Sequence, residues 1–600
     1  MRWTNIALVI LAAALVAVSI ANIYPFVAPL IAHHQTQGIV TVILTNLLLP
    51  HPQTGIGRYY TWIILSIGVL MCMILWTDSK TRRRTTHGSA RYAGRRERSK
   101  YTARRGLPTW QRPGRGIQTS AGGRAGRREF HFRLGWHRGR EISLSEKQQN
   151  EHVLLTAPTG AGKSARLFVP NLLRETGTRS LFIGDLKNEL YQVTAGWLAQ
   201  HMQIWLFAPL RKESQGYNPL AHIHSVEDAQ DFAEAWVSNT GGGGKDGEFW
   251  VNNAKLLITA MTLHLLATRK APAFSELADV LTTSSFKEIQ TILNGTRSPD
   301  ARRLARQFLE NMSQNERLVG SIMTDMGNRF QLLASAQARA VTATNEINFE
   351  EMIETPTAFF LTIPRSETRR YRPLLAVLTM QMFTAWERKG TKGIACYLDE
   401  FTNLGHIPGY ADFISTARYL KVALLMAIQN FSQLIARYGR EDADTIKANA
   451  IHHLLLPGAG LEETKYYSER IGDTTIATET INKRGYGWSE EITSSEGETR
   501  RRLMTADELR TMPEDQMLLL EAKSAPLLVK TKLYFEEKEL AGRANIPYHV
   551  THVRPEPPTS PSPRSPQSLP PASPSGQKTA PSTTTIVDAD QDDDDLFFQQ

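Results

Sequence analysis

One stretch of the chain, Ala157-Pro-Thr-Gly-Ala-Gly-Lys-Ser164, constrains the fold more than any other feature. It lies between the apolar runs 152–156 and 165–169, so the pattern predicts a strand, a glycine-rich loop and a helix in that order. Backbone N–H groups at such a helix start attract phosphate oxygens; the lysine contacts the β- and γ-phosphates and the serine hydroxyl holds Mg²⁺. The alternative is a glycine-rich turn with a solvated lysine. We predict a site for ATP and Mg²⁺ formed by Ala157, Pro158, Thr159, Gly160, Ala161, Gly162, Lys163 and Ser164, with alanine replacing the usual glycine at the first position.

Chain length and cysteine content bound the class of protein. Six hundred residues exceed what one hydrophobic core usually organises, so two or more folded domains are expected. The only cysteines, Cys72 and Cys396, each stand in an apolar run, which implies neither a disulfide framework nor a cysteine metal site. The bulk of the chain therefore suits a reducing compartment, the cytosol.

Two apolar stretches near the start, about residues 5–23 and 59–76, are long enough to cross a bilayer, which takes about 20 residues. A cleaved signal peptide is the rival interpretation of the first, but it leaves the second unexplained and no small-residue cleavage site stands out. Residues 25–57 contain no Lys or Arg, whereas 80–98 are crowded with them. By the positive-inside rule, residues 1–78 are expected to form a two-helix membrane anchor with both chain termini in the cytoplasm.

An arginine- and glycine-rich stretch, residues 79–140, follows this anchor and is expected to be a basic juxtamembrane linker. One interpretation is a solvated segment held to anionic lipid headgroups. The other is a basic collar that contacts nucleic acid through its phosphates. The stretch alone does not decide between them.

Strand-like apolar runs and a helix through 189–198 predict an α/β fold around the phosphate loop. The predicted strands are 180–185, 203–209, 357–363, 393–400, 422–429, 453–456, 517–521 and 527–535, which we expect to extend one parallel sheet with helices on both faces. This nucleotide-binding domain would comprise residues 141–225 and 334–550.

Between these two parts the periodicity changes to that of helices. Ala254, Leu257, Ile258, Met261 and Leu265 share one helix face, as do Leu304, Phe308 and Met312, with Ser298-Pro299 as a helix start. Residues 226–333 are therefore predicted to form an inserted all-α domain. We expect the run of glycines 241–244 to be a flexible loop and the Pro/Ser-rich, finally acidic residues 551–600 to be disordered.

Acidic and amide side chains at predicted strand ends supply the remaining chemistry. Asp399 and Glu400 end one apolar strand, and we assign Asp399 to the Mg²⁺ shell and Glu400 to activation of the attacking water. Gln429 ends the next strand and could orient that water or sense the γ-phosphate. Arg418, between these strands, is either a surface residue or an arginine finger that reaches a neighbouring subunit. The predicted catalytic residues are thus Lys163, Glu400, Gln429 and Arg418.

Several short motifs together resemble the type IV coupling proteins, the membrane-anchored ATPases of bacterial conjugation and type IV secretion. The resemblance covers roughly residues 1–540 and excludes the tail. It rests on His87-Gly-Ser-Ala-Arg91, the phosphate loop with Pro170-Asn-Leu-Leu173, Asp185-Leu-Lys-Asn-Glu-Leu190, Tyr217-Asn-Pro-Leu220, Leu398-Asp-Glu-Phe401 with Leu404-Gly405, Gln429-Asn-Phe-Ser-Gln-Leu434 and Leu503-Met-Thr-Ala-Asp-Glu-Leu-Arg510-Thr-Met-Pro513.

The resemblance implies a RecA-like P-loop domain with an inserted all-α domain, two N-terminal transmembrane helices in the bacterial inner membrane, and hexamers around a channel. It also implies the task of delivering relaxase-bound single-stranded DNA, protein effectors or both to a type IV secretion channel with ATP hydrolysis. It strengthens the finger hypothesis for Arg418. Four basic positions are either solvated loop charges or contacts for DNA phosphates in such a channel: Arg365, Arg369, Arg370 and Arg372.

Two other functions remain open at this point. One is a non-hydrolytic, nucleotide-dependent membrane receptor, for which Glu400 and Gln429 would be unnecessary. The other is a membrane-tethered translocase for duplex DNA, a class that usually has more spans and a long linker before its motor domain.

Overall fold

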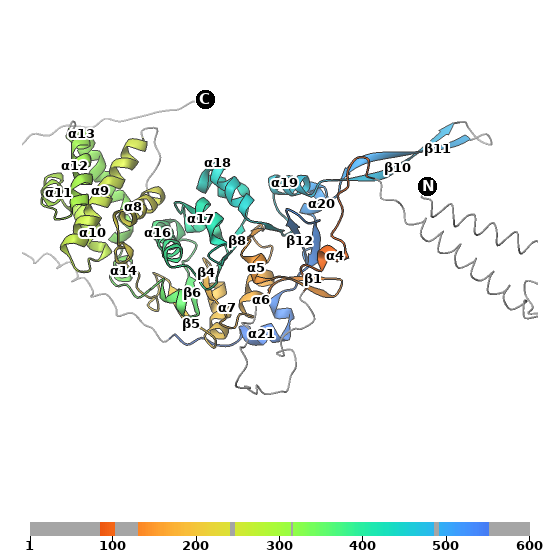
Figure 1. Ribbon diagram of the computed structural model, residues 1–600, viewed down its shortest axis with the longest axis horizontal. Helices are drawn as coiled ribbons and strands as arrows, with labels where there is room; N and C mark the ends of the chain where they lie inside the picture. Colours follow the sequence, from red (N-terminus) through yellow and green to blue (C-terminus); the bar gives the residue numbers. More distant parts are fainter. Residues whose placement is uncertain (1–84, 103–129, 241–246, 314–315, 485–490, 551–600) are drawn as a thin grey trace, which may run out of the picture.

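The computed structural model describes residues 85–102, 130–240, 247–313, 316–484 and 491–550 (Figure 1). None of the helices in these ranges combines the length and apolar character that crossing a bilayer requires. The two predicted spans, the glycine run 241–244 and the tail 551–600 lie outside the described residues.

An eleven-stranded sheet forms the centre of the molecule, in the order β2-β1-β13-β12-β9-β3-β8-β7-β4-β6-β5. Its parallel part runs from β9 to β5. The strands are β1 (Phe132–His137), β2 (Arg140–Leu144), β3 (Val153–Thr156), β4 (Ser180–Gly184), β5 (Gln203–Phe207), β6 (Thr357–Leu361), β7 (Ile394–Leu398), β8 (Val422–Ile428), β9 (His452–Leu455), β12 (Gln516–Glu521) and β13 (Leu527–Lys530).

The prediction of one parallel sheet is wrong at one side. β12 is antiparallel to both β9 and β13, and β1 is antiparallel to both β13 and β2. The connections explain this: residues 522–526 join β12 to β13, and a two-residue turn joins β1 to β2, whereas a parallel neighbour needs a crossover of a dozen or more residues. The predicted strand 527–535 also ends at Lys530.

The predicted linker 79–140 is likewise wrong as a boundary, because its last part is a strand of the sheet. Phe132 and Leu134 of β1 are buried, and the described residues 85–102 pack on the same side of the domain. Within that segment Tyr101 is buried, its backbone oxygen accepts a hydrogen bond from Ser143 N–H at 2.8 Å, and its hydroxyl donates to Glu521. Apolar residues are too few in residues 79–140 to show the alternating pattern of a strand, so β1 is recognised only from its tertiary contacts.

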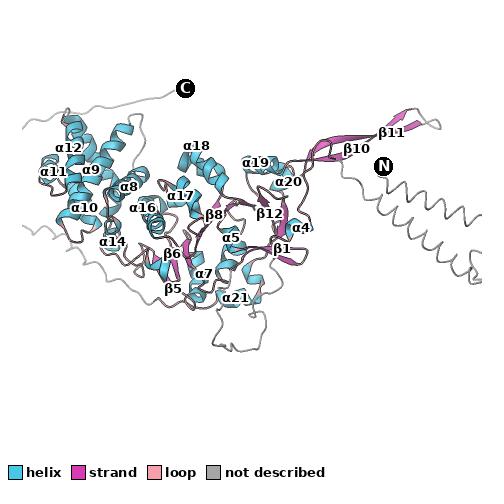
Figure 2. Cartoon of the chain, in the orientation of Figure 1, coloured by secondary structure: helices cyan, strands magenta, loops and turns pink. Residues whose placement is uncertain are grey.

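Alternate side chains of the strands enter two separate cores, one on each face of the sheet. In β3, Leu154 faces one core and Leu155 the other; in β7, Cys396 and Tyr397 divide in the same way. Helices cover both faces, as predicted (Figure 2). One face is covered by α16 (Thr368–Lys389), α17 (Tyr410–Ala417), α18 (Phe431–Asn449) and α19 (Leu461–Ile471); the other by α6 (Val169–Leu172), α7 (Glu189–Leu198) and α21 (Lys538–Ala544). The short helix α5 (Glu146–Gln149) precedes β3.

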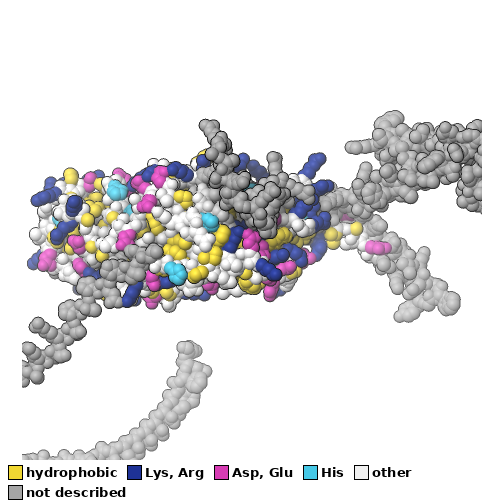
Figure 3. Space-filling model, turned by 90° about the horizontal axis from the view of Figure 1, so that it is seen from below, with side chains coloured by type: hydrophobic (Ala, Val, Ile, Leu, Met, Phe, Trp, Pro, Cys, Tyr) yellow, Lys and Arg dark blue, Asp and Glu magenta, His cyan; other side chains and the backbone are white. Residues whose placement is uncertain are grey.

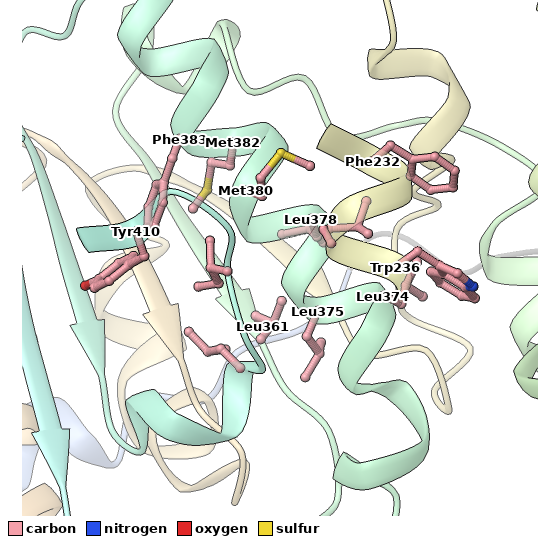
Figure 4. Close-up of a cluster of buried hydrophobic side chains, with 14 of the residues drawn as sticks. Phe232, Trp236, Leu361, Leu374, Leu375, Leu378, Met380, Met382, Phe383 and Tyr410 are labelled. Atoms are coloured by element: carbon pink, nitrogen blue, oxygen red, sulfur yellow. The ribbon is translucent and has the colours of Figure 1, made fainter. Parts of the chain in front are cut away.

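Six helices form an all-α unit at one end of the molecule (Figure 1). The predicted helix faces are confirmed, since all eight of the named apolar residues are buried, and Ser298 Oγ caps its helix by accepting from Ala301 N–H at 3.2 Å. Figure 4 shows Phe232 and Trp236 beside Leu374 and Leu378 of α16, where this unit meets the sheet domain. The helices are α8 (Val226–Asn239), α9 (Gly247–Thr268), α10 (Phe274–Thr283), α11 (Phe286–Asn294), α12 (Pro299–Met312) and α13 (Glu316–Arg329).

Smaller elements complete the chain. A two-stranded ribbon, β10 (Asp473–Arg484) and β11 (Glu491–Arg502), projects from the end opposite the all-α unit (Figure 1). The short helices are α4 (Arg95–Arg98), α14 (Ala336–Val341), α15 (Glu351–Glu354) and α20 (Ala506–Arg510).

A buried histidine in β9 makes stability depend on pH. Burial lowers the pKa of His453 to about 4, while its Nε2–H donates to the Lys447 carbonyl at 3.0 Å. Between pH 6.5 and 4 the unfolded chain therefore takes up a proton that the folded chain does not, so stability falls as pH falls. We expect this residue to cost about 2 kcal/mol of unfolding free energy between pH 7 and 5. The free energy of unfolding in urea should depend less steeply on pH for His453→Gln than for wild type. Equal slopes for the two proteins would contradict a lowered pKa for His453.

Candidate nucleotide-binding site

The glycine-rich loop emerges from the carboxyl end of β3 and leads into a helical turn, Ser164–Phe168, followed by α6. Gly160 and Gly162 have φ of +86° and +74°, values that L side chains rarely adopt. Apart from its two chain neighbours, no described residue has a heavy atom within 4 Å of the position where a Cβ on Gly160 would be. The loop thus keeps the backbone shape and open space that a phosphate group requires.

Lys163 and Ser164 both converge on Asp399, which follows β7 at the same edge of the sheet. Ser164 Oγ donates to Asp399 Oδ1 at 3.0 Å, and Lys163 Nζ lies 3.7 Å from the same oxygen and donates to the Asp399 carbonyl. All three side chains are buried. The ammonium, hydroxyl and carboxylate groups that were predicted to bind phosphate and Mg²⁺ therefore come together from the segments that follow β3 and β7.

Glu400 and Gln429 form a second pair beside this one. β7 and β8 are parallel neighbours, so the residues that follow them meet at one edge of the sheet. Gln429 Nε2 donates to Glu400 Oε1, and the Glu400 side chain is 6% exposed. A carboxylate that is held by an amide and still reachable can accept a proton from a water molecule.

Asp185, after β4, is a buried carboxylate at the same edge of the sheet to which our sequence reasoning gave no role. It accepts hydrogen bonds from the backbone N–H groups of Tyr191 at 2.8 Å and Glu189 at 3.1 Å, at the start of α7. Burial, together with the charge of Asp399, raises its pKa to about 7. The signal in the sequence is its position at the end of the predicted strand 180–185, whereas the adjacency of this strand to β7 comes only from the tertiary structure.

Arg166, one turn into the helix, is another residue that the motif alone did not single out. Its side chain lies against Gly162, 3.1 Å from where a Cβ would stand. Its buried Nε has no hydrogen-bond partner among the described residues. A donor left open at a phosphate loop fits an anionic ligand, so the residues present suit a nucleotide with Mg²⁺ held by Ser164 and Asp399.

Arg418 does not join the other site residues within its own chain. It follows α17 and precedes β8, so it lies at the amino edge of the sheet, whereas Glu400 and Gln429 lie at the carboxyl edge. Its guanidinium pairs with Glu151 at 2.5 Å and is half exposed. Tyr419 beside it is 86% exposed.

The four basic candidates for DNA contact follow β6 at the carboxyl edge, before and within the first turns of α16. Arg365, Arg369 and Arg370 are exposed and Arg372 is half-buried. Burial and the nearby charges of Arg437 and Arg369 lower the pKa of Arg372 to about 10. Like charges gathered in this way favour an anionic neighbour.

A phosphate loop at the carboxyl edge of a parallel sheet, with acidic residues after the neighbouring strands, defines a P-loop nucleotide-binding protein of the RecA-like class. Residues 108–555 match the family model described as type IV secretory system conjugative DNA transfer. The chain belongs to this family of type IV coupling proteins.

Individual relatives are distant in sequence. The conjugal transfer protein TraG of Escherichia coli is 24% identical over 539 residues, which cover 80% of this chain and 81% of TraG. The VirD4 protein of Rhizobium radiobacter is 23% identical over 410 residues, covering 65% of this chain and 58% of VirD4. Among solved structures, the plasmid coupling protein TrwB in complex with ADP and Mg²⁺ superposes with a TM-score of 0.52 at 18% identity, covering 65% of this chain and 87% of TrwB.

Proposed function

We propose that this protein is an inner-membrane ATPase that recruits relaxase-bound single-stranded DNA, protein effectors or both to a type IV secretion channel and helps to drive their transfer. The observation that carries the hydrolytic part is the convergence of Lys163 and Ser164 on Asp399, next to the Glu400–Gln429 pair. A site that only held nucleotide would need neither Glu400 nor Gln429. Family membership and the TraG and VirD4 relatives support the transport role.

Each site residue has a distinct role in the proposed reaction. The Lys163 ammonium neutralises charge on the β- and γ-phosphate oxygens, and the loop amides bind the phosphates. Ser164 and Asp399 would hold Mg²⁺, which supplies electrostatic stabilisation of the phosphates when bound. Glu400 accepts the proton of the attacking water, which Gln429 orients.

Membrane attachment and assembly belong to the same proposal. Two spans at 5–23 and 59–76 would anchor the chain in the inner membrane, with both termini and the ATPase domain in the cytoplasm. Subunits would form a hexamer around a channel, in which Arg365, Arg369, Arg370 and Arg372 contact DNA phosphates.

Arg418 is expected to act at the nucleotide site of a neighbouring subunit, because the nucleotide site of its own chain lies at the opposite edge of the sheet. Arg418→Ala should lower ATP turnover by 10³-fold or more, the order of effect known for arginine fingers. Mixing the Arg418→Ala and Lys163→Ala proteins should restore part of the turnover. In a mixed assembly, a subunit that keeps Lys163 can receive Arg418 from a neighbouring subunit that keeps that arginine. If the mixture is no more active than the two variants measured separately, the residue does not act in trans.

The function is tested by ATP hydrolysis of the full chain with single-stranded DNA, with duplex DNA and without DNA. Stimulation by single strands, absent in Lys163→Ala and Glu400→Gln, is expected. Stimulation by duplex alone would favour the duplex translocase. Nucleotide binding without turnover, in a sample shown to be assembled by size, would favour the receptor.

A further inference from the structure

A cavity of about 500 Å³ lies between α4 and the β1–β2 hairpin, away from the nucleotide site. Its charged and titratable lining residues are Arg95, Arg98, His137, Arg138 and Arg140, accompanied by two hydroxyl side chains and one isoleucine. None of the described residues that line it is Asp or Glu. We call this the arginine pocket.

The charges of the arginine pocket are uncompensated within the described ranges. None of its four arginines forms an ion pair with a described residue. By contrast, on the face of the molecule seen in Figure 3, Lys and Arg side chains lie among Asp and Glu side chains. Arg98 Nη1 donates to His137 Nε2 at 2.6 Å, while His137 Nδ1–H donates to the Leu528 carbonyl at 2.8 Å. The imidazole thus fixes one guanidinium and adds no negative charge. A concave site with this lining selects an anion.

Arg138 occupies a backbone position that disfavours it. It is the first residue of the two-residue turn between β1 and β2, with φ of +51°, followed by Gly139 at +74°. Glycine, asparagine or aspartate suits such a turn, whereas most other residues are strained by roughly 1–2 kcal/mol. Strain retained at a residue that lines a charged cavity points to a use for its side chain.

We propose that the arginine pocket binds the phosphate of an anionic phospholipid headgroup at the membrane surface. The proposal rests on the membrane anchorage proposed above. α4 begins soon after the predicted second span, and it lies at the end of the molecule opposite the all-α unit (Figure 1). Single-stranded nucleic acid is the less suitable occupant, because the part of the lining that the structure describes offers no Phe, Tyr or Trp to stack on a base.

Binding of a short-chain probe to the full-length protein in detergent tests the pocket. Dioctanoyl phosphatidylglycerol is titrated calorimetrically, with dioctanoyl phosphatidylcholine, glycerol 3-phosphate and an oligothymidine as comparisons. The test variant combines Arg95→Gln, Arg138→Gly and Arg140→Gln; the glycine relaxes the strained turn while it removes a guanidinium. Arg96→Gln is the matched control, because Arg96 is exposed on the same helix but does not line the pocket.

We expect saturable binding of phosphatidylglycerol that weakens with salt, falls at least roughly tenfold in the triple variant and persists in Arg96→Gln. Equal affinity for phosphatidylcholine, or unchanged affinity in the triple variant, would overturn the proposal. Equal affinity for glycerol 3-phosphate would reassign the pocket to a soluble phosphate, and preferential binding of the oligothymidine would reassign it to nucleic acid.

Two further measurements separate this proposal from the proposed function. Lys163→Ala should bind the lipid as wild type does while it loses ATP turnover, so a failed ATPase hypothesis leaves the lipid result interpretable. Extraction of the cellular membrane fraction with alkaline carbonate tests anchorage by itself, independently of the pocket.

Discussion

Glu400→Gln is expected to reduce ATP turnover by roughly 10²–10⁴-fold while nucleotide binding is retained. Glutamine has the same shape and keeps an amide oxygen that can accept from Gln429, but it cannot take a proton from water. The Lys163–Ser164–Asp399 cluster, which would contact the phosphates, does not include Glu400. Steady-state hydrolysis and binding of a fluorescent ATP analogue, measured on the same preparation, check both parts.

The matched control is Glu462→Gln, an exposed carboxylate at the start of α19 that contacts Ser432 rather than the nucleotide site. It should hydrolyse ATP as wild type does. Turnover in Glu400→Gln within a factor of two or three of wild type would remove Glu400 from its proposed role and leave the water without an assigned base.

Glu175→Gln is expected to lower the free energy of unfolding by about 3–5 kcal/mol, the usual cost of leaving a buried charge without its partner. Glu175 and Arg179 form a 2.7 Å ion pair between α6 and β4, with the side chains 0% and 4% exposed. Tyr397 also donates to Glu175 Oε1, at 3.1 Å. Removal of the carboxylate charge leaves the Arg179 guanidinium buried among Phe130, Tyr397 and the strands.

Urea unfolding followed by circular dichroism measures this loss. The double variant Glu175→Leu with Arg179→Met should recover most of the stability, because replacing a whole buried pair by apolar groups is often neutral. The exposed pair of Lys389 and Glu350 supplies the comparison, and Glu350→Gln should change stability by less than about 1 kcal/mol. A loss no larger in Glu175→Gln than in Glu350→Gln would contradict the expected cost.

Local sequence pattern was sufficient for the elements with a strong period or a fixed spacing. The phosphate loop, β4 and β5 with α7 between them, and the apolar faces of α9 and α12 all agree with the structure. Each of these is determined by residues within about 20 positions, since helix periodicity, caps and loop glycines act locally.

Pairing between distant segments could not be predicted in the same way. β12 and β13 are apolar runs like the central strands, so their composition does not reveal that they run antiparallel; the short connection between them decides it. β1 was hidden in an arginine-rich stretch because its strand identity depends on β13 and β2, which cover it. Asp185 was missed because its role depends on which strand lies beside β7.

The sequence by itself determined the family and the position of the phosphate loop, and it predicted Lys163, Ser164, Asp399, Glu400 and Gln429 as site residues, because such predictions follow from residue type and position at strand ends. Only the tertiary structure decided that Arg418 lies at the opposite edge of the sheet and that separate arginines of α4 and the β1–β2 hairpin line one pocket. The physical reason is that strand order and helix packing, which bring distant residues together, are set by burial of the whole core rather than by any local pattern.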